Sequence, residues 1–184
     1  MSSALENLAL GEILQMQTIS TLEQYMRKSF CKTASLMAYS CQSAALLASD
    51  LVNDLDDDVH DILSTAFRLG KHLGLMYQLV DDLLDFVGTA DELGKPASGA
   101  DLRSGLATFP VLVAAAQYPD KLQPLIDRRF SRPGDVETAW DLVHADSTTA
   151  IAATRSLIDH HCTSALRAIL RLTQPSPAQD ALIE

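Results

Sequence analysis

The sequence predicts an all-α protein, and three observations support this fold class. Strand signals are almost absent, because no run of alternating Val, Ile, Thr or Tyr is bounded by turn pairs. Long stretches contain no proline and few glycines. Apolar residues make up 47% of the 184 residues and aromatic residues only 5%, so aliphatic side chains can fill a sizeable core. Disordered, collagen-like and disulfide-scaffold classes are excluded.

Two long helices are predicted in the first half of the chain. The first runs from Thr21, whose side chain suits an N-cap, to about Ser49. The second runs from about Val59 to Val87 and stops where Gly88 offers a C-terminal end. The acidic residues that lie between the two helices and at the start of the second are predicted to form a solvated turn and a helix start. These residues are Asp54, Asp56, Asp57, Asp58 and Asp61.

Shorter helices are predicted in the second half. A connection over 88–110, rich in Gly, Pro, Ser and Ala, is too long for a casual link and is therefore expected to be functional. The helices that follow are expected near Ala107–Gln117, Leu122–Phe130, Asp135–His144 and Thr149–Leu172, with a last one starting in the tail PSPAQDALIE.

The charge and the cysteines limit the partners. Fourteen Lys and Arg against 24 Asp and Glu give a net charge of −10, so the chain has no electrostatic footprint for nucleic acid or anionic lipid. Cys31, Cys41 and Cys162 form no CxxC pair and are predicted to be reduced thiols. No apolar run is long enough for a transmembrane segment. The first 15 residues contain no Arg and resemble neither a secretory signal nor a transit peptide.

The segment LMYQLVDDLLDFV carries the most chemical information. Gln78, Asp81, Asp82 and Asp85 are spaced i, i+3, i+4 and i+7, which places them on one face of a helix. Apolar residues fill the positions between them, and no Lys or Arg lies within four positions of the acids. Such carboxylates repel one another unless a cation lies among them, and oxygen ligands favour Mg²⁺ or Mn²⁺. The alternative is a helix whose acids merely face solvent.

A metal held in this way predicts a diphosphate ligand. Mg²⁺ held by a few carboxylates usually completes its octahedron with water and substrate phosphates. Lys95 follows the acidic helix in a Gly-Lys pair, and Lys32-Thr33 lies midway along the first long helix. Both lysines could offer an ammonium group to the phosphates, although a single lysine is more often a surface residue.

These motifs resemble those of the trans-polyprenyl diphosphate synthases. The stretch GLMYQLVDDLLDFVGTADELGKPASGADLRSGLATFPVL is similar to their second aspartate-rich region, and YMRKSFCKTASLMAYSC is similar to their Lys-Thr helix. The resemblance is closest to the mitochondrial-type synthases that make the ubiquinone side chain, and it continues through FSRPGDVETAWDLV to the last residue. It implies an isoprenoid (class I terpenoid) synthase helical bundle, with residues 1–184 as the C-terminal part of a single, incomplete synthase domain.

The resemblance also implies an activity and a set of site residues. The expected reaction is prenyl transfer, in which an allylic diphosphate ionises and the resulting carbocation is attacked by isopentenyl diphosphate. Asp81 is expected to bind Mg²⁺ directly, with Asp82 and Asp85 completing the metal site. Lys32, Thr33, Gln78 and Lys95 are expected to hold the allylic diphosphate, with Asp81, Lys32 and Lys95 as the catalytic residues. A homo- or hetero-oligomer on the matrix side of mitochondria is also implied, or otherwise a cytoplasmic protein.

The sequence departs from the family pattern in two respects. Leu106 occupies a position where many members have a phosphate-binding lysine, and the first aspartate-rich motif and the N-terminal arginines have no counterpart. The chain is therefore expected to match the C-terminal half of a synthase, to be inactive alone and to aggregate or seek a partner. The alternative is a non-catalytic or regulatory subunit that pairs with a complete prenyl synthase.

Other metal sites are disfavoured by the spacing of their candidate ligands. A di-iron bundle needs Glu-x-x-His pairs, and only Asp57/His60 and Asp141/His144 approach that pattern. His160, His161 and Cys162 are adjacent, so their side chains point to different sides of a helix. A surface or interface position is therefore expected for the two histidines, and a core or interface position for Trp140.

Overall fold

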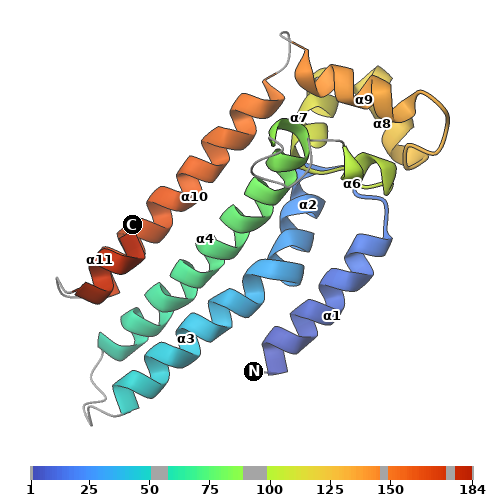
Figure 1. The fold of residues 1–184 in the computed structure, drawn as a ribbon. Helices are drawn as coiled ribbons and strands as arrows, with labels where there is room; N and C mark the ends of the chain where they lie inside the picture. The colour runs from blue at the N-terminus through green and yellow to red at the C-terminus, as the bar shows by residue number, and fades with distance from the viewer. Residues whose placement is uncertain (1, 51–57, 89–98, 146–148, 173–176, 184) are drawn as a thin grey trace. The chain divides into compact units, whose positions relative to one another are not determined.

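The computed structural model describes residues 2–50, 58–88, 99–145, 149–172 and 177–183, and every regular element in these residues is helical (Figure 1). The predicted all-α class is thereby confirmed. The elements are α1 (Ser2–Met16), α2 (Leu22–Ser29), the π-helical turn η1 (Phe30–Ala34), α3 (Ser35–Asp50), α4 (Asp58–Val87), α6 (Ala100–Arg103), α7 (Phe109–Gln117), α8 (Pro119–Asp127), α9 (Asp135–His144), α10 (Ala150–Leu172) and α11 (Pro177–Ile183).

The first predicted long helix is present but is not a regular α-helix throughout. Thr21 caps it as expected, because its hydroxyl accepts a bond from the Gln24 backbone N–H (3.2 Å) while the Gln24 side-chain oxygen accepts one from the Thr21 N–H (3.2 Å). Between α2 and α3 the backbone widens into η1, which hydropathy does not reveal. This wider turn contains the Lys-Thr motif. Single π turns inside α-helices occur often at functional sites.

Helix α1 has no predicted counterpart, whereas α4 and α7 to α11 match the predicted helices with shifted ends. The predicted connection over 88–110 contains the short helix α6, and its residues 89–98 lie outside the described residues. The predicted turn over 53–57 also lies outside them, whereas Asp58 is the first residue of α4. Helix α8 starts at Pro119, which suits a first helical turn, and ends at Asp127 rather than at Phe130. Phe130 cannot continue that helix because its φ is +54°.

The described chain forms two compact units. Unit 1 comprises residues 1–12, 29–76 and 159–184, and unit 2 comprises residues 13–28 and 77–158. In unit 1, α3 lies beside the first half of α4, and two glycines permit this close approach (Figure 1). A Cβ added to Gly70 would lie 2.3 Å from the carbonyl oxygen of Met37, and one added to Gly74 would lie 2.4 Å from the Cα of Ala34. The two backbones are therefore closer than any side chain at these positions would allow.

The last half of α10 packs against α4 within unit 1 through apolar side chains and a histidine pair. Leu69, Ala165, Ala168 and Ile169 form a small buried cluster. His161 is only 5% exposed, and its Nδ1 lies 2.8 Å from the Nδ1 of His72. Of the two histidines expected at a surface or interface position, His160 is exposed, whereas His161 is buried between α4 and α10. The physical reason is that one of two adjacent helical residues faced the neighbouring helix.

Unit 2 has its own core, which brings α2, the second half of α4 and the shorter helices together. Tyr25 packs against Phe109 with ring centroids 5.6 Å apart, and both rings are buried. Trp140 stacks on Phe86 at 5.4 Å, which confirms its expected place against the core. The core continues through the buried residues Leu79, Leu102, Val111, Leu112, Leu122, Ile126 and Val143.

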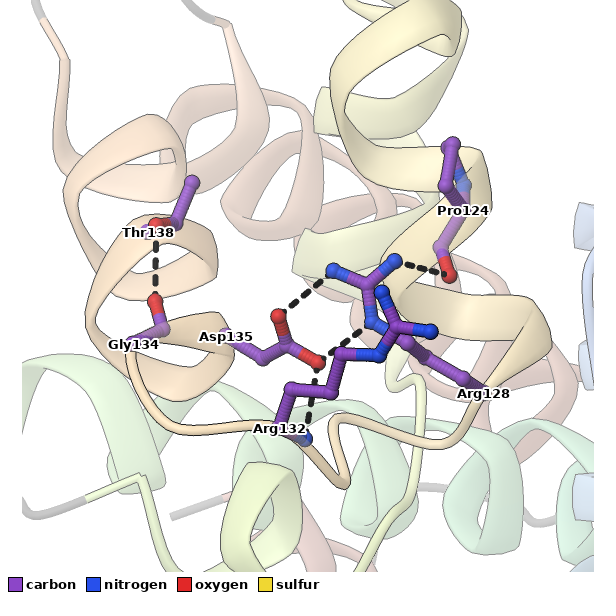
Figure 2. A network of polar contacts seen from close by, with 6 residues as sticks. All are labelled: Pro124, Arg128, Arg132, Gly134, Asp135 and Thr138. Atoms are coloured by element: carbon purple, nitrogen blue, oxygen red, sulfur yellow. Dashed lines mark hydrogen bonds and ion pairs between the residues drawn. The ribbon is translucent and has the colours of Figure 1, made fainter.

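An ion pair closes the turn between α8 and α9 in unit 2. The Arg128 guanidinium donates two bonds to the Asp135 carboxylate, at 2.7 and 2.6 Å, and a third to the Pro124 carbonyl oxygen at 3.1 Å (Figure 2). The Arg132 backbone N–H donates to the same carboxylate at 3.1 Å. Bonding from Arg128 lowers the pKa of Asp135. This clamp holds a turn in which Arg129 has a φ of +55°, an unusual value for a residue other than glycine.

None of the helices in the described part of the chain is both long and apolar enough to cross a membrane.

The close approach of α3 and α4 predicts the effect of filling Gly74. Replacing a helical glycine by alanine normally stabilises a helix by about 1 kcal/mol. We expect Gly74→Ala to do the opposite and to lower the free energy of unfolding by about 1–3 kcal/mol, because the new methyl group meets the Ala34 backbone. Urea unfolding measures the change, with Thr163→Ala at an exposed position of α10 as the control. A stabilised Gly74→Ala protein would contradict this packing.

The buried histidine pair predicts acid sensitivity. Burial, followed by the positive charges of His72, His160 and Lys71, lowers the pKa of His161 to about 4. The unfolded chain has a histidine pKa near 6.5, so between these values it binds a proton that the folded chain does not. The contribution of His161 to stability is therefore present above pH 6.5 and is lost as the pH falls towards 4.

We expect the free energy of unfolding of His161→Gln to fall less between pH 7 and pH 5 than that of the unmodified chain. The expected difference is on the order of 1 kcal/mol, because solvent screening reduces the full linkage value. His60→Gln, at an exposed position of α4, should keep the original slope. Equal slopes for all three proteins would rule out this role of His161.

Candidate functional site

The acidic residues at the end of α4 lie in unit 2 at different depths. Asp81 is exposed, Asp85 is partly buried and Asp82 is only 2% exposed. The neighbouring apolar residues Leu79, Leu83 and Phe86 are buried. This end of α4 therefore packs into the core of unit 2, as the sequence predicts. The three carboxylates are therefore not equivalent.

The Asp82 carboxylate is hydrogen-bonded to protein groups and is shielded from solvent. Its Oδ1 accepts a bond from the Gln78 side-chain amide at 2.9 Å, and its Oδ2 accepts one from the Phe109 backbone N–H at 3.3 Å. Burial raises its pKa, while a hydrogen bond from Tyr25, the charge of Lys28 and the bonds from Gln78 and Phe109 oppose that rise. Because Phe109 is the first residue of α7, Asp82 joins the start of that helix to α4.

Asp85 binds the backbone at the start of α6. Its two oxygens accept bonds from the backbone N–H groups of Ala100 (2.9 Å) and Asp101 (3.0 Å). Gly99 precedes these residues with a φ of +64°, and its N–H donates to the Asp85 carbonyl oxygen at 3.3 Å. A glycine fits this left-handed conformation without steric cost. The side chain of Asp85 is thus an anchor for the first residues of α6.

Two further charged residues, for which the sequence pattern predicts no role, belong to this cluster. Asp101 is partly buried, and burial followed by the charges of Asp82, Asp85 and Asp81 raises its pKa to about 6. Lys28 is 9% exposed, lies 4.8 Å above the Tyr25 ring and opposes the pKa rise of both Asp82 and Asp101. Asp101 begins the segment DLRSGLAT, which is part of the stretch that resembles the second aspartate-rich region and could have suggested it. Nothing in the sequence distinguishes Lys28 from a surface lysine.

The chemistry of this cluster fits a hard cation. Burial is the largest cause of the raised pKa of Asp101, and the charges of Asp82, Asp85 and Asp81 add to it while the charge of Lys28 opposes it. Carboxylate oxygens are the ligands that Mg²⁺ and Mn²⁺ prefer. In the residues that the structure describes, no three His, Cys, Asp or Glu side chains converge closely enough to form a ready-made cage. The oxygens of Asp82 and Asp85 accept bonds from protein groups, and Asp81 is the exposed acid of the three.

The predicted diphosphate-binding residues are distributed over several places. Gln78 contacts Asp82, as described above. Lys32 and Thr33 belong to η1 in unit 1, where the Lys32 ammonium lies 3.5 Å from the Glu12 carboxylate. Lys95 lies outside the described residues. The convergence of these groups on the carboxylates of unit 2 therefore stays a prediction.

Comparisons with known proteins give a consistent result. A sequence profile described as polyprenyl synthetase matches residues 1–143. The chain is 40% identical to a human all trans-polyprenyl-diphosphate synthase and 43% identical to a decaprenyl-diphosphate synthase of Dictyostelium discoideum. Both alignments cover the whole chain, but the chain spans only 42% and 38% of those relatives.

Solved structures show the same fold. A medium/long-chain length prenyl pyrophosphate synthase of Arabidopsis matches 99% of the chain with 30% identity and a TM-score of 0.82, and the match covers 60% of that protein. A polyprenyl synthase of Caulobacter crescentus, complexed with calcium and isoprenyl diphosphate, matches 99% of the chain with 29% identity and a TM-score of 0.78, over 54% of its own length.

The different depths of the aspartates predict different effects on stability. Asp82→Ala leaves the Gln78 amide and the Phe109 N–H without their acceptor, so we expect a loss of about 2–3 kcal/mol in the free energy of unfolding. Asp82→Asn keeps one acceptor oxygen but turns an NH2 group towards the second donor, so it should cost less than Asp82→Ala, about 1–2 kcal/mol. Asp81→Ala, at an exposed position, should change stability by less than about 0.5 kcal/mol in chemical denaturation. A neutral Asp82→Ala substitution would mean that these bonds do not hold α7.

Proposed function

Because this chain belongs to the polyprenyl synthetase family, we propose that it supplies the part of a trans-prenyltransferase site that ionises an allylic diphosphate. The acidic end of α4 carries this proposal, since Asp82 and Asp85 are fixed by the protein while Asp81 is exposed beside them. The substrates would be an allylic diphosphate and isopentenyl diphosphate. The product would serve as the side chain of ubiquinone, as the resemblance implies.

We propose that Asp81 holds Mg²⁺, with Mn²⁺ as a substitute, and that Asp82 and Asp85 support the site. When bound, the metal supplies positive charge opposite the negative charge that develops on a departing diphosphate. Asp82 keeps the end of α4 in place through Gln78 and Phe109. Asp85 fixes the chain beyond residue 98, where Asp101 brings a fourth carboxyl group to the cluster.

The lysines complete the proposed charge balance. In the reaction, the allylic C–O bond breaks and both electrons leave with the diphosphate oxygen. The double bond of isopentenyl diphosphate then supplies the electrons for the new C–C bond, and a proton is lost. Lys32, Thr33, Gln78 and Lys95 would hold the diphosphate during ionisation, and Lys32 and Lys95 would stabilise its added charge. The π turn that carries Lys32 and Thr33 supports a functional role for that segment.

The chain spans about two fifths of the length of the curated relatives named above, so the activity of a whole synthase is proposed for it only in combination with further sequence. We propose that residues 1–184 form the C-terminal part of one synthase domain and work in an oligomer. Relatives from Yarrowia lipolytica and Neurospora crassa carry the word mitochondrial in their names, which supports a mitochondrial location, and the family resemblance implies the matrix side.

A second candidate function is that of a non-catalytic subunit that pairs with a complete synthase. Exposed apolar side chains favour it, because Met16 is 79% exposed and Leu5 and Leu47 are each 66% exposed. Contiguous exposed apolar groups are typical of surfaces that another chain covers. The accumulated carboxylates favour catalysis instead, since a purely structural subunit gains nothing from charges that repel one another.

A prenyl-transfer assay separates the two functions. The 184-residue chain is incubated with Mg²⁺, farnesyl diphosphate and labelled isopentenyl diphosphate, and extracted products are counted. The same assay is run on a chimera in which this chain replaces the matching part of the Dictyostelium decaprenyl synthase. We expect no product from the chain alone and Mg²⁺-dependent product from the chimera.

In the chimera, Asp81→Ala should lower turnover by about 10²–10³-fold, because a charge-stabilising group is removed from the transition state. Asp159→Ala, which removes an exposed acid from α10, should leave turnover unchanged. Undiminished turnover in the Asp81→Ala chimera would reject Asp81 as a metal ligand. An inactive chimera that still binds a complete synthase would favour the subunit function.

A further inference from the structure

A small basic pocket lies between α4 and α10 within unit 1. It encloses about 210 Å³ and is lined by Arg68 and His72 from α4 and by Ser164, Arg167, Ala168 and Arg171 from α10. The residues from α10 are spaced i, i+3, i+4 and i+7, and those from α4 are spaced i and i+4, so each set lies on one helix face. The pocket uses none of the residues assigned to prenyl transfer.

The charges around this pocket are unbalanced. Three guanidinium groups and an imidazole line it, and no acidic residue does. Burial, followed by the positive charges of Lys71, His160 and Arg68, lowers the pKa of His72. Within the described residues no carboxylate forms an ion pair with Arg68, Arg167 or Arg171. In a chain with a net charge of −10, such a group of cations is unexpected unless an anion offsets their repulsion.

The walls of the pocket are held in place by bonds that leave the cations available. The Arg68 Nη2 donates to the Thr65 hydroxyl at 2.9 Å, which fixes one edge of the guanidinium group. The His72 ring is fixed by its 2.8 Å bond to His161. Ala168, which is 6% exposed, forms the floor and adds no bulk. All three arginines are exposed, so an anion can reach them from solvent without opening the helix pair.

We propose that this pocket binds a phosphate-bearing anion, either free phosphate or diphosphate or the headgroup of a phospholipid. Guanidinium groups present paired N–H donors that match phosphate oxygens, and several around one site give stronger binding than a single charge. The pocket volume is below the roughly 300–1,000 Å³ that is usual for pockets that bind organic ligands. At about 30 Å³ per water molecule, this volume suits one or two phosphate groups. The Ser164 hydroxyl supplies a neutral donor to the same space.

Calorimetric titration of the 184-residue chain with inorganic diphosphate tests this proposal. The buffer contains EDTA and little salt, because binding of diphosphate at the acidic end of α4 would need a metal ion, whereas binding to arginines does not. We expect one site per chain, with affinity that falls as salt is added. Arg167→Gln/Arg171→Gln should weaken binding at least about tenfold. Arg155→Gln removes an exposed arginine from the same helix outside the pocket and should change affinity less than about twofold.

A second titration uses vesicles of phosphatidylcholine with and without phosphatidic acid, scored by co-sedimentation. Binding to diphosphate alone supports a soluble ligand. Binding only to phosphatidic acid vesicles, lost in the double variant and kept in Arg155→Gln, supports a lipid headgroup. The proposal is overturned if neither probe binds, or if Arg155→Gln weakens binding as much as the double variant does. Arg171→Gln alone, checked by its helical circular dichroism, keeps the test open if the double variant does not fold.

Discussion

A buried carboxylate must be hydrogen-bonded, and the arrangement of unit 2 depends on how the bonds of Asp82 are made. Its oxygens accept one bond from within α4 and one from the first residue of α7, while Lys28 and Tyr25 of α2 act on the same group. An acid this deeply buried costs free energy unless such partners are present. The chain meets that requirement by drawing three helices towards one side chain. The surrounding apolar core then fixes the position of the neighbouring acids.

The site is therefore built from acids that do different work. The carboxylate oxygens of Asp82 and Asp85 accept hydrogen bonds from backbone and amide N–H groups, and this leaves Asp81 as the exposed carboxylate of the motif. A motif read only as three metal ligands would miss this division. Structural bonds of this kind support catalytic groups in general, because a group that acts on a substrate must itself be held. Asp101 is held to the same cluster through its backbone bond to Asp85, and burial and the neighbouring acids raise the pKa of its carboxyl group.

In unit 1 the equivalent constraint is the distance between backbones. Gly70 and Gly74 bring α4 against α3 more closely than side chains would permit. Gly11 likewise lets the backbone of α1 approach Lys32, because a Cβ added there would lie 2.5 Å from the Lys32 backbone nitrogen. The Lys-Thr segment lies in this tightly packed region and adopts a π turn. In the same stretch of α4, Arg68 and His72 line a pocket with residues of α10, and its charge is opposite to that of the acidic end. The chain thus separates its two charge systems into different units.

The sequence by itself determined the helical class, most helix bounds, the acidic face of α4 and the family. These features follow from local periodicity, from capping residues such as Thr21 and from motifs a few residues long, all of which act over short distances along the chain. Only the tertiary structure decided that Asp82 is buried, that Lys28 and Asp101 join it, that His161 faces His72, and that three arginines share a pocket. Each of these depends on which residues distant in sequence become neighbours, and burial and pKa depend on those neighbours rather than on residue type.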